Sequence, residues 1–159
     1  MTQSQPTEAQ LKYVEEFASF MTRTGLAWMP GRVMAWLLVC QPPQQTAAQI
    51  ADALGASRGA ISGAVNLLTT SRLIERVRFR GDRKDYFRIP ADAWTVRFRH
   101  GVELTRELGQ LARRGLSALP DKSEENAYRL NELAEFTEFS EQETVDMLKR
   151  WEQQRGRQQ

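Results

Sequence analysis

Two polar stretches carry the residues whose types and spacing could do chemistry. The first combines small side chains with side chains that form hydrogen bonds: Ser57, Arg58, Gly59, Ser62 and Asn66. Arginine guanidinium and asparagine amide groups hydrogen-bond the edges of guanine and adenine, and serine hydroxyls contact phosphate oxygens. Small neighbours would let a helix bring these groups close to a surface. The stretch therefore predicts a face that reads polar groups on a duplex, with an ordinary solvated helix face as the alternative.

The second stretch is basic and has the period of a β-hairpin. Arg80, Arg83 and Lys84 surround a turn at Gly81 and Asp82, where cations suit phosphate binding but are also a common solubility feature. The period of two predicts an apolar face and a basic face. The apolar face would hold Val77, Phe79, Phe87 and Ile89, and the basic face Arg76, Arg78, Arg80 and Arg88. The arginines of the two strands would either contact phosphates or pair with the acidic residues beside them.

Two short helices precede the hairpin and would position the first stretch. Their apolar stripes are Ala47, Ile50, Ala51 and Leu54, and then Ile61, Ala64, Val65 and Leu68. Gly55 can end the first helix in the left-handed conformation, and Ser57 is a good N-cap for the second. A helix, a turn, a second helix at about residues 57–70 and a wing at residues 80–85 follow the order of a winged helix-turn-helix. In that fold the second helix enters the major groove of DNA.

Further helices are predicted on both sides of this unit, so the fold class is mainly α with a small β wing. Caps and apolar stripes place them at Thr7 to about Arg23, Arg32 to Cys40, Asp92 to about Leu116, Ser123 to Phe136, and from Ser140, which forms a capping box with Glu143. Their stripes hold more large apolar side chains than the winged unit could cover, which indicates a dimer. We expect an N-terminal dimerisation helix at residues 1–27, a DNA-binding domain at 28–90 and a C-terminal helical dimerisation region at 91–159.

Composition and charge fit this interpretation. The 159 residues are 41% hydrophobic and 26% charged, as in a soluble globular protein. Residues 57–88 hold eight Lys/Arg against three acidic residues, whereas residues 121–159 hold six against ten, so positive charge lies where phosphate binding is predicted. The longest apolar run, Val33 to Cys40, is too short to cross a bilayer. With no recognisable secretory signal and a single cysteine, we expect a cytoplasmic protein without a membrane partner.

The patterns of an enzyme or a metal site are missing from the sequence. We find no phosphate-binding glycine loop, no dinucleotide fingerprint and no nucleophile elbow. His100 has no second metal ligand at coordination spacing. We therefore expect no catalytic residues, no cofactor and no metal. The rival interpretation from another class is a winged helix that docks an acidic protein partner.

The same residues resemble the MarR-type transcriptional regulators. The stretch GRVMAWLLVCQPPQQTAAQIADALGASRGAISGAVNLL, followed by GDRKDYFRI, is similar to the branch related to the glycine-betaine synthesis repressor. The resemblance covers about residues 25–89. It implies a homodimeric, sequence-specific regulator, in most cases a repressor, whose helix at residues 57–70 binds a double-stranded operator. Asp82 and Arg83 match the wing-tip pair of the family, which implies Arg83 in the minor groove and, often, release by a small-molecule effector.

Four aromatic residues suggest a pocket for such an effector. Trp28, Trp36, Trp94 and Phe98 could cage a quaternary ammonium by cation–π attraction, since the resembled branch includes a choline-responsive regulator. The alternative, which we favour, is core packing, the usual role of tryptophan at helical spacing. Cys40 also has two interpretations: a redox switch, as in some relatives, or a buried and inert thiol, which we favour because no cation is adjacent.

Overall fold

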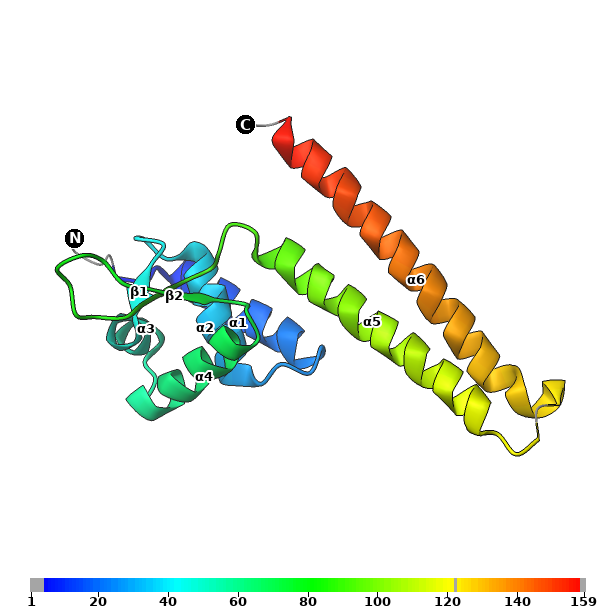
Figure 1. Cartoon of the computed structure of the whole chain (residues 1–159). Coiled ribbons are helices and arrows are strands. Elements are labelled where there is room, and N and C mark those ends of the chain that lie inside the picture. Colours follow the sequence, from blue (N-terminus) through cyan, green and yellow to red (C-terminus); the bar gives the residue numbers. More distant parts are fainter. Residues whose placement is uncertain (1–4, 122, 158–159) are drawn as a thin grey trace. The chain divides into compact units, whose positions relative to one another are not determined.

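The computed structural model describes residues 5–121 and 123–157, and the chain divides into two compact units, Met1–Ala93 and Trp94–Gln159. Within the described residues, the first unit holds four helices and three short strands, and the second is built from two long helices (Figure 1). The fold class is the predicted one, mainly helical with a small antiparallel sheet. The finer division at residues 28 and 91 stays a prediction.

The first two helices, α1 (Glu8–Thr22) and α2 (Trp28–Val39), pack against each other. They lie in close contact at Gly31, where an added Cβ would lie 3.1 Å from the Cα of Ala18. α2 begins one turn earlier than the sequence predicted. The reason is that Pro30 lies in the first turn of the helix, where a backbone N–H has no intrahelical partner and its loss is tolerated.

α3 (Ala47–Leu54) and α4 (Arg58–Thr70) form the predicted helix-turn-helix. Gly55 ends α3 with a φ of 58°, in the left-handed region that favours glycine. The apolar faces of both helices pack against α2. The largest fully buried side chains of the resulting core are Met34, Trp36, Ile50, Ile61 and Leu68. The apolar stripes read from the sequence are therefore the residues that hold α4 in place.

One arginine of α2 joins three helices. The Nε of Arg32 donates a hydrogen bond to Glu15 of α1 at 2.7 Å, and its Nη2 donates to the carbonyl of Leu54, the last residue of α3, at 3.0 Å. The last carbonyls of a helix have no intrahelical partner, so the guanidinium satisfies one of them. The side chain of Arg32 is only 16% exposed. The end of α3, and with it the turn into α4, is therefore fixed to the first two helices.

Three short strands make the sheet, in the order β1-β3-β2 with antiparallel pairing. They are β1 (Gln45–Thr46), β2 (Glu75–Val77) and β3 (Tyr86–Arg88). β1 was not predicted, because a strand of two residues next to a helix N-cap shows no alternating pattern. It pairs with β3 and so connects the hairpin to the start of α3. We call the β2–β3 hairpin the wing, and residues 80–85 the wing tip.

The predicted faces of the wing are wrong. Arg76 pairs across the ladder with Phe87, and Val77 pairs with Tyr86. Directly paired residues lie on the same face of a sheet, so Val77 and Phe87 lie on opposite faces. Phe87 is buried, with the Arg76 guanidinium 5.7 Å from the centre of its ring. Side chains do alternate between the two faces within each strand, as predicted. The register across the turn, however, places the apolar side chains of β2 and those of β3 on opposite faces of the sheet.

The second unit consists of α5 (Ala93–Ala118) and α6 (Glu124–Gly156), which lie side by side and antiparallel (Figure 1). The predicted helix break before Ser140 is wrong, because α6 is continuous through that position. No proline or glycine interrupts residues 124–155. The carbonyl of Ser140 accepts a hydrogen bond from the Thr144 hydroxyl at 2.8 Å, so the residues of the supposed cap are part of an ordinary helix interior.

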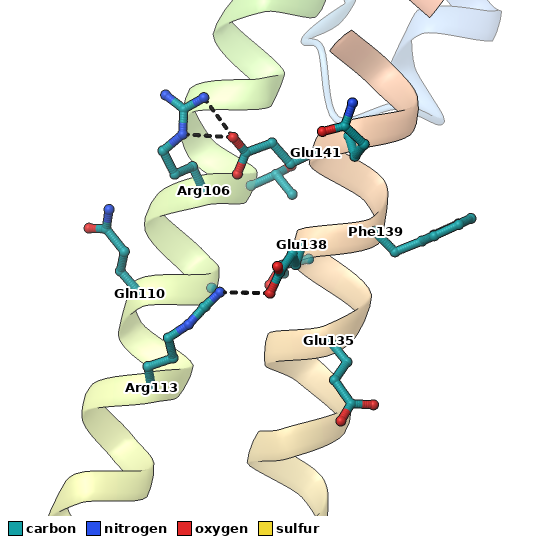
Figure 2. A pocket seen from close by; sticks show the side chains of 11 residues that line it. Arg106, Gln110, Arg113, Glu135, Glu138, Phe139 and Glu141 are labelled. Atoms are coloured by element: carbon teal, nitrogen blue, oxygen red, sulfur yellow. Dashed lines mark hydrogen bonds and ion pairs between the residues drawn. The ribbon is translucent and has the colours of Figure 1, made fainter. Parts of the chain in front are cut away.

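Small residues and ion pairs hold α5 against α6. Gly109 of α5 is buried, and a Cβ added to it would lie 2.6 Å from the Oγ1 of Thr137. The ion pairs that cross the seam are Arg99–Glu152, Arg106–Glu141 and Arg113–Glu138. Figure 2 shows the second and third of these pairs. No helix within the described ranges is long and apolar enough to cross a membrane.

Candidate nucleic-acid interface

The polar face of α4 is exposed and carries the first stretch of candidate residues. Ser57 is the N-cap of the helix, and its hydroxyl accepts a hydrogen bond from the backbone N–H of Ala60 at 3.2 Å. The opposite face holds the buried stripe Ile61, Ala64, Val65 and Leu68. Arg58, Gly59, Ser62 and Asn66 therefore all point to solvent. Ser57 accepts this capping bond with its hydroxyl oxygen and keeps its O–H donor, so a phosphate contact from Ser57 stays a prediction beside the other four candidate residues.

Two glycines on this exposed face have no role in internal packing. A Cβ added to Gly59 or to Gly63 would meet no atom within 4 Å in the described chain. Glycine in a helix interior costs roughly 1 kcal/mol relative to alanine. Neither glycine has a positive φ that would explain the choice of residue. The two positions leave the helix backbone accessible along the face that bears Ser62 and Asn66.

Most cations of the wing strands are paired inside the wing. Arg76 and Arg78 both pair with Asp85, at 3.4 and 2.5 Å, and Arg88 pairs with Glu75 at 2.5 Å. The hydrogen bond from Arg78 is the main cause that lowers the pKa of Asp85. These arginines therefore form the predicted ion pairs, and phosphate contact by them stays a prediction.

The wing tip carries the cations that remain available. Arg80, Arg83 and Lys84 are exposed, and none of them forms an ion pair with any residue that the structure describes. Positive charge that no carboxylate neutralises is what binding to a phosphate backbone requires. The three side chains therefore match the predicted role of the wing tip in residue type and exposure.

A hollow of about 620 Å³ lies between α3, α4 and the wing. It brings together three of the predicted site residues, Ser62 and Asn66 from α4 and Lys84 from the wing tip. The other predicted residues do not line it: Ser57, Arg58, Gly59, Arg80 and Arg83. Sequence reasoning did not single out the remaining polar side chains of the lining: Thr46, Gln49, Asp52 and Tyr86. The capping-box spacing of Thr46 and Gln49 could have placed them at the start of α3, next to this hollow.

Comparison with known proteins decides the family. A family model described as the MarR family matches residues 25–85, and one described as the MmpR5-like MarR family transcriptional regulator matches residues 92–154. The HTH-type transcriptional regulator MmpR5 of Mycobacterium tuberculosis (strain ATCC 25618 / H37Rv) is 34% identical over 146 residues, which cover 92% of this chain and 88% of that protein. The chain belongs to the MarR family of transcriptional regulators. It is a DNA-binding regulator of transcription and not an enzyme.

A solved structure supports the same assignment. It is described as the crystal structure of a transcriptional regulator, and it is 34% identical to this MarR-family chain, with a TM-score of 0.81. The match covers 91% of this chain and 99% of that one, so the likeness includes the long helices as well as the winged unit. The rival interpretation, a winged helix that docks an acidic protein, is not favoured by these relatives.

The aromatic residues proposed as an effector pocket differ in their environments. Trp36 lies in the core of the first unit, 1% exposed, and its indole N–H has no hydrogen-bond partner among the described residues. Trp28, Trp94 and Phe98 are each almost half exposed. Trp28 and Trp36 belong to the first unit, and Trp94 and Phe98 to the second. A pocket formed by all four stays a prediction.

Cys40 and His100 show no sign of reactive or metal chemistry. Cys40 is 2% exposed, its thiol donates to the carbonyl of Pro42 at 3.3 Å, and burial raises the pKa of the thiol to about 11. A thiol that stays protonated is a poor nucleophile, as the core interpretation requires. His100 is exposed, with Glu103 3.4 Å from its Nδ1. No group of three or more metal-ligating side chains is placed to hold an ion within residues 5–121 and 123–157.

A second hollow, of about 800 Å³, lies between α5 and α6 (Figure 2). The charged residues that line it largely pair with each other. Arg106 binds Glu141 at 2.6 Å, and Arg113 binds Glu138 at 3.0 Å. Because these guanidinium groups already have carboxylate partners, the hollow is part of the seam between the two helices.

Proposed function

We propose that this regulator reads its operator with α4 in the major groove while the wing tip contacts the adjacent minor groove. The observation that carries this proposal is the pair of exposed glycines, Gly59 and Gly63, on the same face as Ser62 and Asn66. Without side chains at these positions, the backbone of α4 can lie close to the edges of the bases. Asn66 then offers an amide suited to adenine, and Arg58 a guanidinium suited to guanine.

The wing tip supplies the second half of the proposed contact. Arg80, Arg83 and Lys84 form no ion pair with any residue that the structure describes, whereas the strand arginines are paired. Arginine is the residue that most often enters a narrow minor groove, where the negative potential is enhanced. We therefore assign Arg83 to the minor groove and Lys84 to a phosphate of the strand that borders it.

The dimer is the next part of the proposal. Many large apolar side chains are exposed on the two helices of the second unit, among them Trp94, Phe98, Leu104, Leu108, Leu111, Tyr128, Phe136, Phe139 and Trp151. Phe139 points away from α5, so the helix pair does not cover it (Figure 2). Exposed apolar surface of this extent is typical of a protein–protein interface. A second copy of the same helices is the partner that we propose, with two copies of α4 spaced about 34–36 Å apart for half-sites one helical turn apart.

Two finer parts of the functional assignment remain predictions. The first is that the regulator represses its target and is released by a small-molecule effector. The second is the likeness to the branch of the glycine-betaine synthesis repressor, since the family models that match are the MarR family in general and its MmpR5-like group. Genome-wide capture of bound DNA would identify the operator and the neighbouring genes, and transcript levels in a deletion strain would give the direction of control.

The DNA contacts are tested with two arginine variants and one matched control. Arg83→Ala should weaken binding to operator and random duplexes alike and reduce the slope of log Kd against log salt by about one, as expected when a cation that recognises no particular base is removed. Arg58→Ala should mainly reduce the preference for operator over random duplex, by roughly 1–3 kcal/mol, as expected for a base contact. Arg88→Ala is the control, because its guanidinium already pairs with Glu75, and it should change neither property substantially.

Two outcomes would contradict this assignment. Equal loss of specificity in Arg83→Ala and Arg58→Ala would mean that their roles were assigned wrongly. Failure of the wild-type protein to shift any duplex at low salt would remove the proposed DNA contacts altogether. Fluorescence anisotropy over a salt series separates these cases, because it measures affinity and salt dependence together.

The dimer is tested by adding charge to its proposed interface. Replacing Leu108 and Leu111 of α5 by glutamate would bury two unpaired carboxylates, so sedimentation velocity should report a monomer. Gln110→Glu makes the same kind of change beside Arg113 in the hollow between α5 and α6, and it should leave the dimer intact. A wild-type protein that sediments as a monomer at micromolar concentration, or a double variant that remains dimeric, would contradict the proposed interface.

A further inference from the structure

The wing tip is a closed turn rather than an open loop. Gly81 has a φ of 85°, in the left-handed region that glycine adopts without a Cβ clash. The backbone N–H of Asp82 donates to the carbonyl of Phe79 at 3.0 Å, which closes the turn. The chain then passes through Arg83 and Lys84 before it enters β3 at Tyr86.

The carboxylate of Asp82 uses both of its oxygens within this short segment. Its Oδ1 accepts a hydrogen bond from the backbone N–H of Lys84 at 2.9 Å, and its Oδ2 accepts one from the hydroxyl of Tyr86 at 2.8 Å. These two bonds lower the pKa of Asp82, the bond from Lys84 being the larger cause. The carboxylate therefore stays ionised, and an ionised carboxylate is the stronger acceptor for both donors.

The sheet holds Tyr86, the hydrogen-bond partner of Asp82, in place. Tyr86 is the first residue of β3 and pairs across the sheet with Val77 on one side and Thr46 on the other. Its ring also packs edge-on against Phe79, with the ring centres 5.1 Å apart. A hydrogen bond to the Tyr86 hydroxyl therefore connects Asp82 to the sheet, and Arg83 and Lys84 lie in the segment between the two connected residues.

The negative charge of Asp82 distinguishes an effect on DNA binding through charge from one through conformation. A carboxylate beside two DNA-binding cations repels phosphate, so by charge alone it weakens binding. Asp85 differs from it, because Asp85 directly pairs with Arg76 and Arg78. The hydrogen-bond donors to Asp82 are instead a backbone amide and a phenol. Asp82 can therefore favour DNA binding only through the conformation that it imposes on the wing tip.

We propose that Asp82 is a positioning residue for DNA binding, which together with Tyr86 holds the wing tip so that Arg83 faces the minor groove and Lys84 faces the phosphate beside it. The inference rests on the proposed function, since it takes the wing tip as a DNA contact. It adds two residues, an acid and a tyrosine, that act without touching DNA.

The test compares Asp82→Ala and Tyr86→Phe with the wild-type dimer on a fluorescein-labelled duplex of mixed sequence, by anisotropy over a salt series. Each variant should bind about three- to tenfold more weakly at low salt, the range expected when one hydrogen bond maintains a contact. The slope of log Kd against log salt should fall by about one as a phosphate contact is lost. The double variant should bind about as weakly as either single variant, because both changes break the same connection.

Asp52→Ala is the matched control for the loss of negative charge. Asp52 is exposed on α3 and lines the same hollow as Lys84. Removing its charge should leave the affinity unchanged or raise it. Thermal unfolding followed by circular dichroism should give the same midpoint for all variants, because the wing tip is exposed and contributes little to the core.

The outcomes separate the two proposals. If Asp82→Ala binds as tightly as the wild type or more tightly, with an unchanged salt slope, charge alone governs this position and the positioning role is refuted. Additive losses in the double variant would likewise refute a shared role with Tyr86. If the wild-type dimer binds no duplex, the proposed DNA contacts and this inference both fail. If Asp82→Ala fails to fold, Tyr86→Phe, which changes no charge, decides the question alone.

Discussion

Replacing Gly109 by alanine tests how closely α5 and α6 pack. A Cβ at this position would lie 2.6 Å from the Oγ1 of Thr137, a distance that real Cβ contacts do not reach. Thr137 is 3% exposed, and its hydroxyl donates to the carbonyls of Leu133 and Ala134 in the same helix. Rotation of the Thr137 side chain would disturb these hydrogen bonds, so we expect the two helices to separate instead.

The magnitude follows from two opposing effects. Alanine is favoured over glycine in a helix by about 1 kcal/mol, whereas overpacking a tight contact costs typically about 1–3 kcal/mol. Gly101→Ala is the matched control, since it makes the same substitution in the same helix at a position with no atom within 4 Å in the described chain. Gly101→Ala should raise the free energy of unfolding by about 1 kcal/mol. The free energy of unfolding of Gly109→Ala should be about 1–3 kcal/mol lower than that of Gly101→Ala.

Urea unfolding followed by far-ultraviolet circular dichroism, at one protein concentration, measures the difference. Adding Thr137→Ala to Gly109→Ala removes the clashing oxygen and should recover most of the lost free energy of unfolding. If Gly109→Ala is as stable as Gly101→Ala, the helices are not in contact at this point. If Thr137→Ala does not restore stability, the contact lies elsewhere on α6.

Two further predictions concern single side chains. Cys40 should resist alkylation by iodoacetamide at neutral pH in the folded protein, because its pKa of about 11 keeps the thiol protonated; mass spectrometry that finds rapid labelling before unfolding would contradict its burial. Asp121→Ala should lower the unfolding midpoint. The Asp121 carboxylate accepts hydrogen bonds from the backbone N–H of Ser123 and from the Asn126 amide at the start of α6. These bonds lower the pKa of Asp121. A depressed folded pKa stabilises the protein above the unfolded value of about 3.9. The difference between variant and wild type should therefore be constant near neutral pH and disappear in acid, and a constant difference down to low pH would refute this cause.

The helix-turn-helix could be predicted because its information is local. The stripe Ile61, Ala64, Val65 and Leu68 has the period of a helix that packs on one side. Gly55 ends α3 and Ser57 begins α4, so the turn between the two helices is marked within three residues of chain. The break predicted at Ser140 shows the limit of such signals. A capping box is also a sequence that an uninterrupted helix tolerates, and only the absence of a helix breaker nearby distinguishes the two.

The wing and the site depended on information that the sequence does not hold locally. The faces of the wing are set by the pairing of Arg76 with Phe87 across the turn, and a shift of one residue in register reverses them. The division of the wing cations into paired and available ones depends on where Asp85 lies. The role that we propose for Asp82 could not be predicted for the same reason, because its distance to the Tyr86 hydroxyl is fixed by the fold of the wing tip.

The contacts of Arg32 that fix the end of α3 lie apart from the face that we propose reads DNA. The end of α3 is held from behind, by a guanidinium that contacts Glu15 and the carbonyl of Leu54. Positions 58, 62 and 66 are exposed and take no part in that connection. Under the proposed DNA contacts, substitutions there would change which operator is chosen while the scaffold keeps its shape. A family built on such a platform can acquire new target genes one surface residue at a time.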